Sequence, residues 1–230
     1  IQYLGFRYHG WAKQPSIKTV HHMVDRTLKF VFGELPFKTL GGSRTDAMVS
    51  ANDFILELFI EQPIDDEGAF LADFNLNLPA DIRALSIEKT DADFNIIQSP
   101  KVKDYIYLFA HGEKAHPYAA PFLTAIQEEL DIRLMTEGAI FFQGQHDFRA
   151  YCKKPKPETE TIRTIELCEL NKNTEMSASF FPKQTYMVHF KSKGFMRNQI
   201  RLIMGQLFRL GKGEIDLQYI KESLKTGFPD

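Results

Sequence analysis

The segment of this chain whose residue types best suit covalent chemistry is residues 41–47, Gly-Gly-Ser-Arg-Thr-Asp-Ala. Two glycines allow a tight turn with exposed backbone amides, which together with Arg44 could hold an anion such as a phosphate. Asp46 follows this permanent cation closely, which favours the ionised carboxylate that a nucleophile or a base needs. The residues leave one alternative open, a tight turn in which Thr45 or Asp46 hydrogen-bonds its own backbone.

A second polar segment, residues 194–201, carries two arginines. Arg197 and Arg201 are four residues apart, on one face of a predicted helix, and Asn198 lies on a neighbouring ridge. Like charges at this spacing repel each other unless an anion lies between or beside them. That anion could be a phosphate or a carboxylate such as Asp46, and two solvated arginines are the alternative.

Two other sets of residues are less specific. His146 and Asp147 are adjacent, which suits acid–base or metal chemistry, but no third ligand has suitable spacing. We therefore interpret them as part of a capped turn and predict no metal site. Tyr105 and Tyr107 lie on the same face of a predicted strand, where their rings either pack in a core or stack on a base.

Composition places the chain among ordinary globular proteins. It has 230 residues, of which 43% are hydrophobic and 25% charged, and this excludes a disordered, a collagen-like or a disulfide-scaffold chain. The hydrophobic runs are too short for a membrane span. The two cysteines, Cys152 and Cys168, lack the spacing of a zinc site. So few cysteines are typical of a protein of the reducing cytoplasm.

Charge is distributed unevenly along the chain. The net charge is −2, yet residues 52–93 hold two basic and 11 acidic residues, whereas residues 149–212 hold 13 basic and five acidic residues. This asymmetry indicates a basic face within a nearly neutral total, as in a nucleic-acid-binding protein. A solvated basic surface without a partner is the alternative.

Hydrophobic spacing predicts the elements that must position these residues. We predict an α+β protein with two halves and antiparallel sheets. The boundary is expected near Ser99-Pro100, which gives an N-terminal domain, 1–100, with the Asp46 segment and a C-terminal domain, 101–230, with the basic face. The predicted strands are residues 3–7, 53–61, 85–90, 102–110, 163–170 and 185–191. The predicted helices are residues 18–32, 70–76, 120–137, 195–210 and 214–226.

Five motifs, in order along the chain, resemble those of the tRNA pseudouridine synthase A family. Residues 42–47 resemble its G-x-x-R-T-D-A catalytic loop, with one spacer difference at the glycine, and residues 194–205 resemble its G-F-x-R-N-x-x-R-x-x-x-G helix. Tyr105 falls on the first Tyr of its Y-x-Y strand. Residues 6–11 with Gln14 resemble its opening strand and loop, and residues 146–148 resemble its H-D-F turn.

The resemblance implies two ferredoxin-like (RRM-like) halves joined across a central cleft, in a homodimer. It implies that uridine in tRNA becomes pseudouridine without a cofactor, usually in the anticodon stem-loop at positions 38–40. By resemblance, Asp46 is the catalytic carboxylate and Arg201 pairs with it. Tyr105 stacks on the target base and helps to move the carbon-5 proton, and Arg44 takes the space of the flipped nucleotide. The residues expected to contact RNA are Arg44, Lys153, Lys154, Lys156, Lys193, Arg197 and Asn198.

Three departures from the family pattern bear on specificity. Residues 48–50 read Met-Val-Ser where the family usually has Gly-Val-His, and residues 94–97 read Phe-Asn-Ile-Ile where it commonly has Phe-His-Ala-Arg. In the first helix, His21 stands where Gln is usual. These departures motivate an alternative, a non-catalytic or differently targeted RNA-binding paralogue. A third reading is a metal-dependent hydrolase that uses His146 and Asp147.

Overall fold

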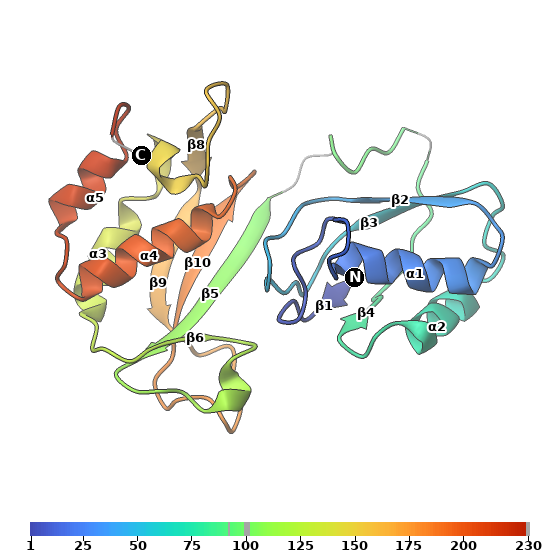
Figure 1. The fold of residues 1–230 in the computed structure, drawn as a ribbon, viewed down its shortest axis with the longest axis horizontal. Coiled ribbons are helices and arrows are strands. Elements are labelled where there is room, and N and C mark those ends of the chain that lie inside the picture. Colours follow the sequence, from blue (N-terminus) through green and yellow to red (C-terminus); the bar gives the residue numbers. More distant parts are fainter. Residues whose placement is uncertain (92, 99–101, 229–230) are drawn as a thin grey trace. The chain divides into compact units, whose positions relative to one another are not determined.

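The chain divides into two compact α+β units in the computed structural model, residues 1–99 and residues 100–230 (Figure 1). The structure describes residues 1–91, 93–98 and 102–228. The boundary expected at Ser99-Pro100 falls outside these described residues. Each unit has its own buried hydrophobic core.

Helix α1, Val20–Phe32, is the main helix of the first unit. Its N-cap Thr19 accepts a hydrogen bond from the backbone N–H of His22 at 3.3 Å, which satisfies one of the free amides of the first turn. The helix ends at Gly33, whose combination of φ 62° and ψ −117° is favourable only for glycine. Val20, Val24 and Leu28 of its predicted apolar stripe are buried in the core.

The strands of the first unit form two separate antiparallel pairs. β2, Phe37–Gly41, pairs with β3, Leu56–Ile60, and β1, Gln2–Tyr3, pairs with β4, Ile82–Arg83. A single bridge between Tyr3 and Ala51 extends the first strand's contacts. The second helix, α2, spans Glu67–Asn77 and packs beside α1 (Figure 1).

The strand predicted at residues 85–90 does not form, and strand β2 was not predicted. The amide of Asn75, on α2, donates to the carbonyl of Ala84 at 2.9 Å and accepts from its N–H at 2.8 Å. The Asn75 side chain thus satisfies both backbone groups of Ala84, which in a longer strand would pair with a neighbouring strand. β2 is short and mixed in composition, and its pairing with β3 stabilises it.

The second unit is built on one four-stranded sheet with the order β6-β5-β10-β9. Long antiparallel ladders join β10 to both β5 and β9. β5 and β6 are parallel, so the expectation of purely antiparallel sheets is wrong at this pair. The bounds are β5 Lys103–His111, β6 Thr124–Ile126, β9 Leu167–Lys172 and β10 Tyr186–Ser192.

Helices α3, Ile132–Ile140, and α4, Gln199–Gly211, bury one face of this sheet (Figure 1). Their side chains, among them Met135, Ile203 and Leu207, pack against Phe109 and Phe190 of the strands and exclude water from the core. The remaining elements of the unit are α5 Leu217–Ser223, the pair β7 Gly144–Asp147 and β8 Ile162–Ile165, and the single 3₁₀ turns Pro117–Ala119 and Arg149–Tyr151.

The helix predicted at residues 120–137 is only partly correct. Asp131 caps a helix that begins at Ile132, accepting from the backbone N–H of Leu134 at 2.9 Å. The residues before it instead include β6, whose backbone pairs with β5. Pairing with a neighbouring strand therefore overrides the helical spacing of the apolar residues.

The general α+β class is confirmed by the element order. The ferredoxin-like form of the halves stays a prediction. No helix within residues 1–91, 93–98 and 102–228 is both long and apolar enough to cross a membrane.

A buried hydrogen bond in the second unit gives a first prediction for stability. The Tyr151 hydroxyl lies 2.6 Å from Ser223 Oγ, whose own proton is donated to the carbonyl of Ile220 at 2.7 Å. We expect Tyr151→Phe to lower the free energy of unfolding by about 1 kcal/mol, because Ser223 loses its donor in a dry site. Urea denaturation measures this, with Tyr118→Phe as control, since the Tyr118 side chain is 70% exposed. An unchanged unfolding curve for Tyr151→Phe would contradict the prediction.

Candidate active site

The segment that contains Asp46 leaves strand β2 directly. We call residues 42–47 the Asp46 loop. The backbone N–H of Gly42 donates to the carbonyl of Ile55 at 2.9 Å, which continues the β2–β3 pairing by one step. At the other end, Met48 has a left-handed φ of 65° and donates its N–H to the carbonyl of Tyr8 at 2.9 Å. Both ends of the loop are therefore fixed by backbone hydrogen bonds, and Asp46 is partly buried between them.

Thr45, directly before Asp46, is held from two sides. Its carbonyl accepts from the backbone N–H of Trp11 at 3.3 Å, and its hydroxyl lies 3.0 Å from the hydroxyl of Tyr3. Both partners come from the first strand and the turn after it, far away in sequence. These contacts limit how far the backbone beside Asp46 can move.

Gly10 is the point of closest approach between this turn and the loop. Its φ is 87°, and a Cβ added there would overlap the carbonyl oxygen of Thr45 and lie 3.1 Å from the carbonyl carbon of Asp46. Glycine is therefore required both by the backbone conformation and by space.

The turn itself is anchored to the body of the first unit. The buried hydroxyl of Tyr8 donates to Asp81 Oδ1 at 2.7 Å, and Arg7 forms a salt bridge with the same carboxylate. Burial, together with the hydrogen bond to Asp81, raises the pKa of Tyr8 to about 12. The Tyr8 hydroxyl thus stays protonated and donates to Asp81 at physiological pH. This anchor helps to hold the Tyr8 carbonyl where it accepts the N–H of Met48.

Two other side chains of the Asp46 loop differ in exposure. Arg44 is exposed, as a residue that contacts a nucleic acid must be. The Ser43 hydroxyl oxygen is buried and has no hydrogen-bond partner among the described residues.

Tyr105 and Tyr107 of the second unit both face the side of the sheet that α4 covers. The ring of Tyr105 is half-buried and meets Phe195 edge-on, with centroids 5.4 Å apart and planes at 84°. The Tyr107 hydroxyl contacts Thr124 Oγ1 at 2.9 Å, and its ring packs on Phe208. Packing therefore accounts for Tyr107, and an aromatic wall beside Tyr105 fixes the angle of its ring.

The prediction that Arg197 and Arg201 share a helical face is wrong. Helix α4 begins at Gln199, and Asn198 before it has a left-handed φ of 58°. Arg197 therefore lies outside the helix, whereas Arg201 is in its first turn and exposed. Residue spacing alone does not reveal this left-handed residue, although asparagine is one of the few residues besides glycine that adopt the conformation readily.

The structure brings the basic loop near residue 153 together with Arg197. The backbone N–H of Lys153 donates to the carbonyl of Arg197 at 3.1 Å. We call Lys153, Lys154, Lys156 and Arg197 the basic turn; all four side chains are exposed. Lys193 is also exposed, whereas Asn198 is partly buried.

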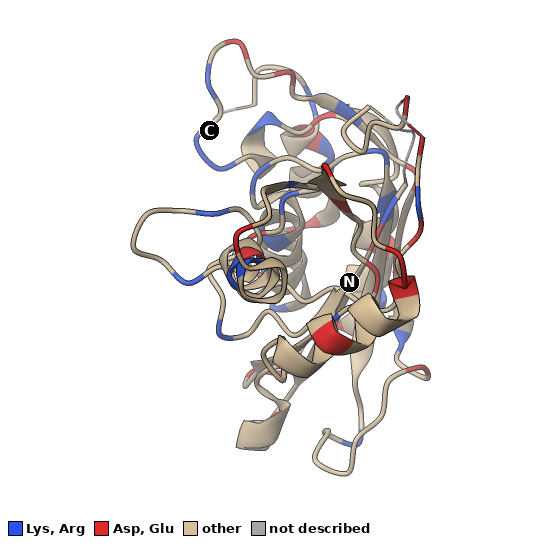
Figure 2. Ribbon diagram, turned by 90° about the vertical axis from the view of Figure 1, so that its right-hand side faces the viewer, with Lys and Arg blue, Asp and Glu red and all other residues tan. Residues whose placement is uncertain are grey.

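Charge on the first unit is arranged differently. Glu67 and Asp73 are the charged residues of α2, and Figure 2 shows red segments and no blue ones on this helix. A polyanion would be repelled by such a surface. The basic turn of the second unit is therefore a better candidate for phosphate contacts than the surface of α2.

His146 and Asp147 are the last two residues of strand β7, and Asp147 caps the turn that follows. His146 Nε2 lies 2.7 Å from the carbonyl of Gln143, and Asp147 Oδ1 accepts from the backbone N–H of Arg149 at 3.1 Å. Among the described residues, no three His, Cys, Asp or Glu side chains are grouped as a metal site requires.

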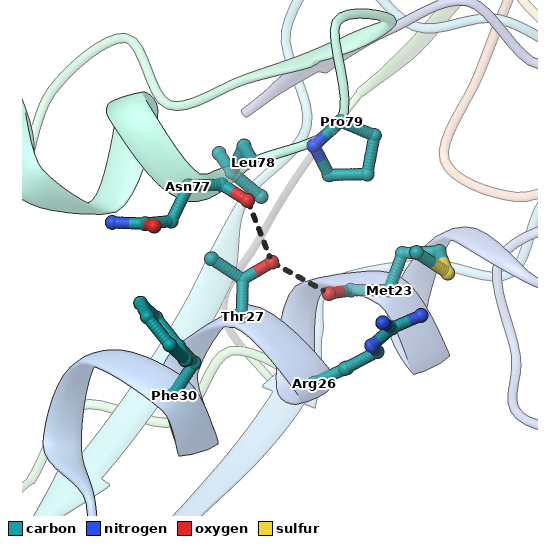
Figure 3. A pocket seen from close by; sticks show the side chains of 7 residues that line it. All are labelled: Met23, Arg26, Thr27, Phe30, Asn77, Leu78 and Pro79. Carbon is teal, nitrogen blue, oxygen red and sulfur yellow. Dashed lines mark hydrogen bonds between the residues drawn. The ribbon is translucent and has the colours of Figure 1, made fainter.

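A cavity of about 330 Å³ lies between α1 and the end of α2, and no residue of the Asp46 loop lines it. Figure 3 shows Thr27 at its centre, hydrogen-bonded to the carbonyls of Met23 and Asn77. Phe30 and Arg26 also line it. None of the predicted site residues does, so the chemistry predicted from the sequence does not concern this cavity.

Sequence reasoning missed the residues that hold the Asp46 loop: Tyr3, Gly10 and Trp11. Their signal in the sequence was weak but present, because Gly10 and the only Trp of the chain lie within the opening motif at residues 6–11. Their role depends on tertiary contacts to Thr45 that no local pattern encodes.

Comparison with known proteins agrees with the motifs. The family model described as tRNA pseudouridine synthase matches residues 139–230. The tRNA pseudouridine synthase A 2 of Clostridium perfringens is 30% identical over 227 residues, covering 99% of this chain and 88% of the relative. The tRNA pseudouridine synthase A of Aquifex aeolicus is 28% identical over 225 residues, with 98% and 88% covered. Because the similarity extends over nearly the whole chain, including the Asp46 loop and α4, this protein belongs to the tRNA pseudouridine synthase family.

Proposed function

We propose that this enzyme isomerises uridine to pseudouridine in tRNA and that Asp46 is its catalytic carboxylate. The observation that carries the proposal is the Asp46 loop itself. Its Arg-Thr-Asp sequence is supported on both sides by backbone hydrogen bonds, in a chain related over 99% of its length to a tRNA pseudouridine synthase A 2. A carboxylate on a fixed loop is what a positioned nucleophile requires.

The reaction needs no oxidant or reductant. Asp46 attacks the ribose or the base and forms a temporary bond to it, and the bond from N1 of the uracil to C1′ of the ribose breaks. The bond to Asp46 breaks again as the product forms, which returns the free carboxylate. The base turns, C5 bonds to C1′, the proton leaves C5, and N1 gains one. Atoms and charge balance, which agrees with a reaction that requires no cofactor.

We assign the other predicted residues to this reaction as follows. Tyr105 stacks on the base and helps to move the C5 proton, while Arg201 stabilises the ionised form of the catalytic carboxylate. Arg44 fills the space of the flipped nucleotide, which offsets part of the unstacking cost of a few kcal/mol. The half-buried ring of Tyr105 and the exposure of Arg44 and Arg201 support these roles.

The finer points of the proposal follow the resemblance. The target lies in the anticodon stem-loop, at positions 38–40, and the enzyme works in the cytoplasm as a homodimer. Pseudouridine mapping of tRNA from cells with and without the gene tests the target. Loss of pseudouridine at one or more of positions 38–40 in the deletion strain is expected. An unchanged map would overturn the proposed activity, and loss at other positions only would overturn the proposed target. Sedimentation analysis tests the dimer.

Phosphate binding by the basic turn gives a separate prediction. Changing Lys153, Lys154 and Lys156 together to Glu should weaken tRNA binding at least about tenfold and flatten its salt dependence by about one unit of slope per lost contact. These three side chains are exposed, so the fold should be retained. Filter binding or fluorescence anisotropy at several salt concentrations measures the effect.

A matched control makes the same change in charge elsewhere on the second unit. Lys114, Lys172 and Lys183 are exposed and lie outside the basic turn. The triple Glu variant of these residues should bind tRNA nearly as the unchanged protein does. Equal losses in both variants would show that net charge, rather than the basic turn, controls binding.

A further inference from the structure

Trp11 connects helix α1 to the Asp46 loop. Its indole ring, 2% exposed, stacks on the ring of His21, with centroids 5.1 Å apart and planes at 17°. The indole also packs on the ring of Phe54, with centroids 3.9 Å apart. It lies so close to Gly41, the residue before the loop, that a Cβ on Gly41 would overlap Trp11 Nε1 and lie 2.7 Å from Cε2. Its backbone N–H donates to Thr45. Trp11 therefore contacts the loop at its start and beside Asp46.

His21 holds Trp11 and β2 together. Its backbone N–H donates to the carbonyl of Trp11 at 3.1 Å, and its Nε2 lies 2.7 Å from Thr39 Oγ1. The Thr39 hydroxyl gives its proton to Asp25 Oδ1 at 2.6 Å, so it accepts from a protonated Nε2 of His21. Thr39 is in β2, two residues before Gly41.

We propose that His21 is a positioning residue of this enzyme, which holds Trp11 and Thr39 and thereby sets the place of the Asp46 loop. The proposal rests on the proposed role of Asp46. His21 itself does not touch the reacting atoms. Its ring contacts the end of β2 in two ways. The edge of the ring binds Thr39 directly, and the face of the ring packs on Trp11, which in turn contacts Gly41.

The surroundings of His21 make this contact sensitive to pH. The ionisable groups that face it are Asp25, on α1 itself, and Lys13, from the loop before the helix, which is paired with Asp25; β2 contributes the uncharged hydroxyl of Thr39. Burial lowers the pKa of His21, Asp25 opposes this effect and Lys13 adds to it.

The sign of the pH effect follows from this direction. A neutral His21 is the form that the folded protein favours, so its stabilising contribution is complete above the ordinary histidine pKa of about 6.5. It is lost as the pH falls through the lower pKa of the folded state. Below that pH, a charged ring gains more from water than from the stack.

Substitution of His21 tests the positioning role by kinetics. His21→Ala should lower kcat on tRNA about tenfold or more and leave KM within about twofold, because small misplacements of a reacting group cost rate rather than binding. His21→Gln retains an N–H that can reach Thr39 but loses the ring, and should recover part of the rate. It should also remove the fall of kcat at acidic pH that we expect for the unchanged protein. His22→Gln, on the adjacent exposed residue, is the matched control and should change nothing.

Two readouts are independent of catalysis. Trp11 is the only Trp, so the tryptophan fluorescence reports on its surroundings, in which His21 is the ionisable ring in contact at 5.1 Å. The fluorescence should fall as the pH is lowered, since a protonated imidazole near an indole quenches it, and His21→Gln should remove this transition. Hydrogen exchange of amides 41–47 should accelerate in His21→Ala. These measurements still test the inference if Asp46 proves not to be catalytic.

The outcomes separate cleanly. Slower kcat with unchanged KM, a pH-dependent Trp11 signal that needs His21, and faster exchange in the loop would support positioning. A rate within twofold of the unchanged protein, an increase in KM alone, or unchanged exchange at residues 41–47 would overturn it. If His21→Ala does not fold, His21→Gln decides by the same criteria.

Discussion

Replacing Asp46 by Asn should reduce pseudouridine formation by about 10⁴-fold or more while tRNA binding stays within a few-fold of normal. Asn has nearly the same shape, but its neutral amide is a poor nucleophile and a poor base. The hydrogen bond from Val49 N–H to residue 46 uses the backbone carbonyl, so the loop should keep its conformation. Tritium release from tRNA labelled at carbon 5 of uridine measures the rate.

The control for this variant is Asp53→Asn, an exposed carboxylate of the same unit outside the Asp46 loop. It should retain full activity. An Asp46→Asn enzyme that still turned over at the normal rate would eliminate Asp46 as the catalytic carboxylate. If the unchanged protein itself bound tRNA and modified none, the non-catalytic paralogue would be the better description.

Gly10→Ala should have the second largest effect, because it moves the backbone on which Asp46 sits. The new Cβ would overlap the carbonyl oxygen of Thr45, and the φ of 87° would strain any side chain. Backbone atoms cannot turn aside as side chains do, so either the loop or the turn at residues 5–10 must shift. A shift of about 1 Å at the reacting group costs on the order of 10²-fold in rate. Single-turnover kinetics at saturating enzyme measures this loss.

Gly33→Ala separates this clash from backbone strain. Gly33 also has a positive φ, 62°, but a Cβ added there would meet nothing within 4 Å. This control should lose about 1–3 kcal/mol of stability, from its strained backbone conformation (φ 62°, ψ −117°) alone, and keep its rate. Equal losses of rate in the two variants would mean that the approach of Gly10 to Thr45 has no special role.

The sequence predicted those features that depend on local periodicity. The stripe of Val20, Val24 and Leu28 gave α1 nearly to its ends, because one face of this helix is buried. The alternation in residues 102–110 gave β5 for a similar reason. The candidate site residues were found from motifs, which contain the residue types that the chemistry needs.

Other features depend on contacts that no short window contains. Residues 124–126 are a strand because β5 offers them a partner, and their own apolar spacing suggested a helix. Arg197 lies outside α4 because Asn198 has a left-handed conformation and the helix begins only after it. The support of Thr45 by Trp11 joins residues 34 positions apart, and it arises only when the first unit closes.

The pairing of β1 with β4 affects how the enzyme matures on the ribosome. Gln2 pairs with Arg83, so the first strand emerges early and must wait for the fourth before its edge is covered. Tyr3, which contacts Thr45, is in β1, the strand that is still without its partner β4 at this stage. A nascent chain that ends before residue 83 therefore contains the complete Asp46 loop without its full support. Translation must therefore pass residue 83 before the Asp46 loop has its full support within the first unit.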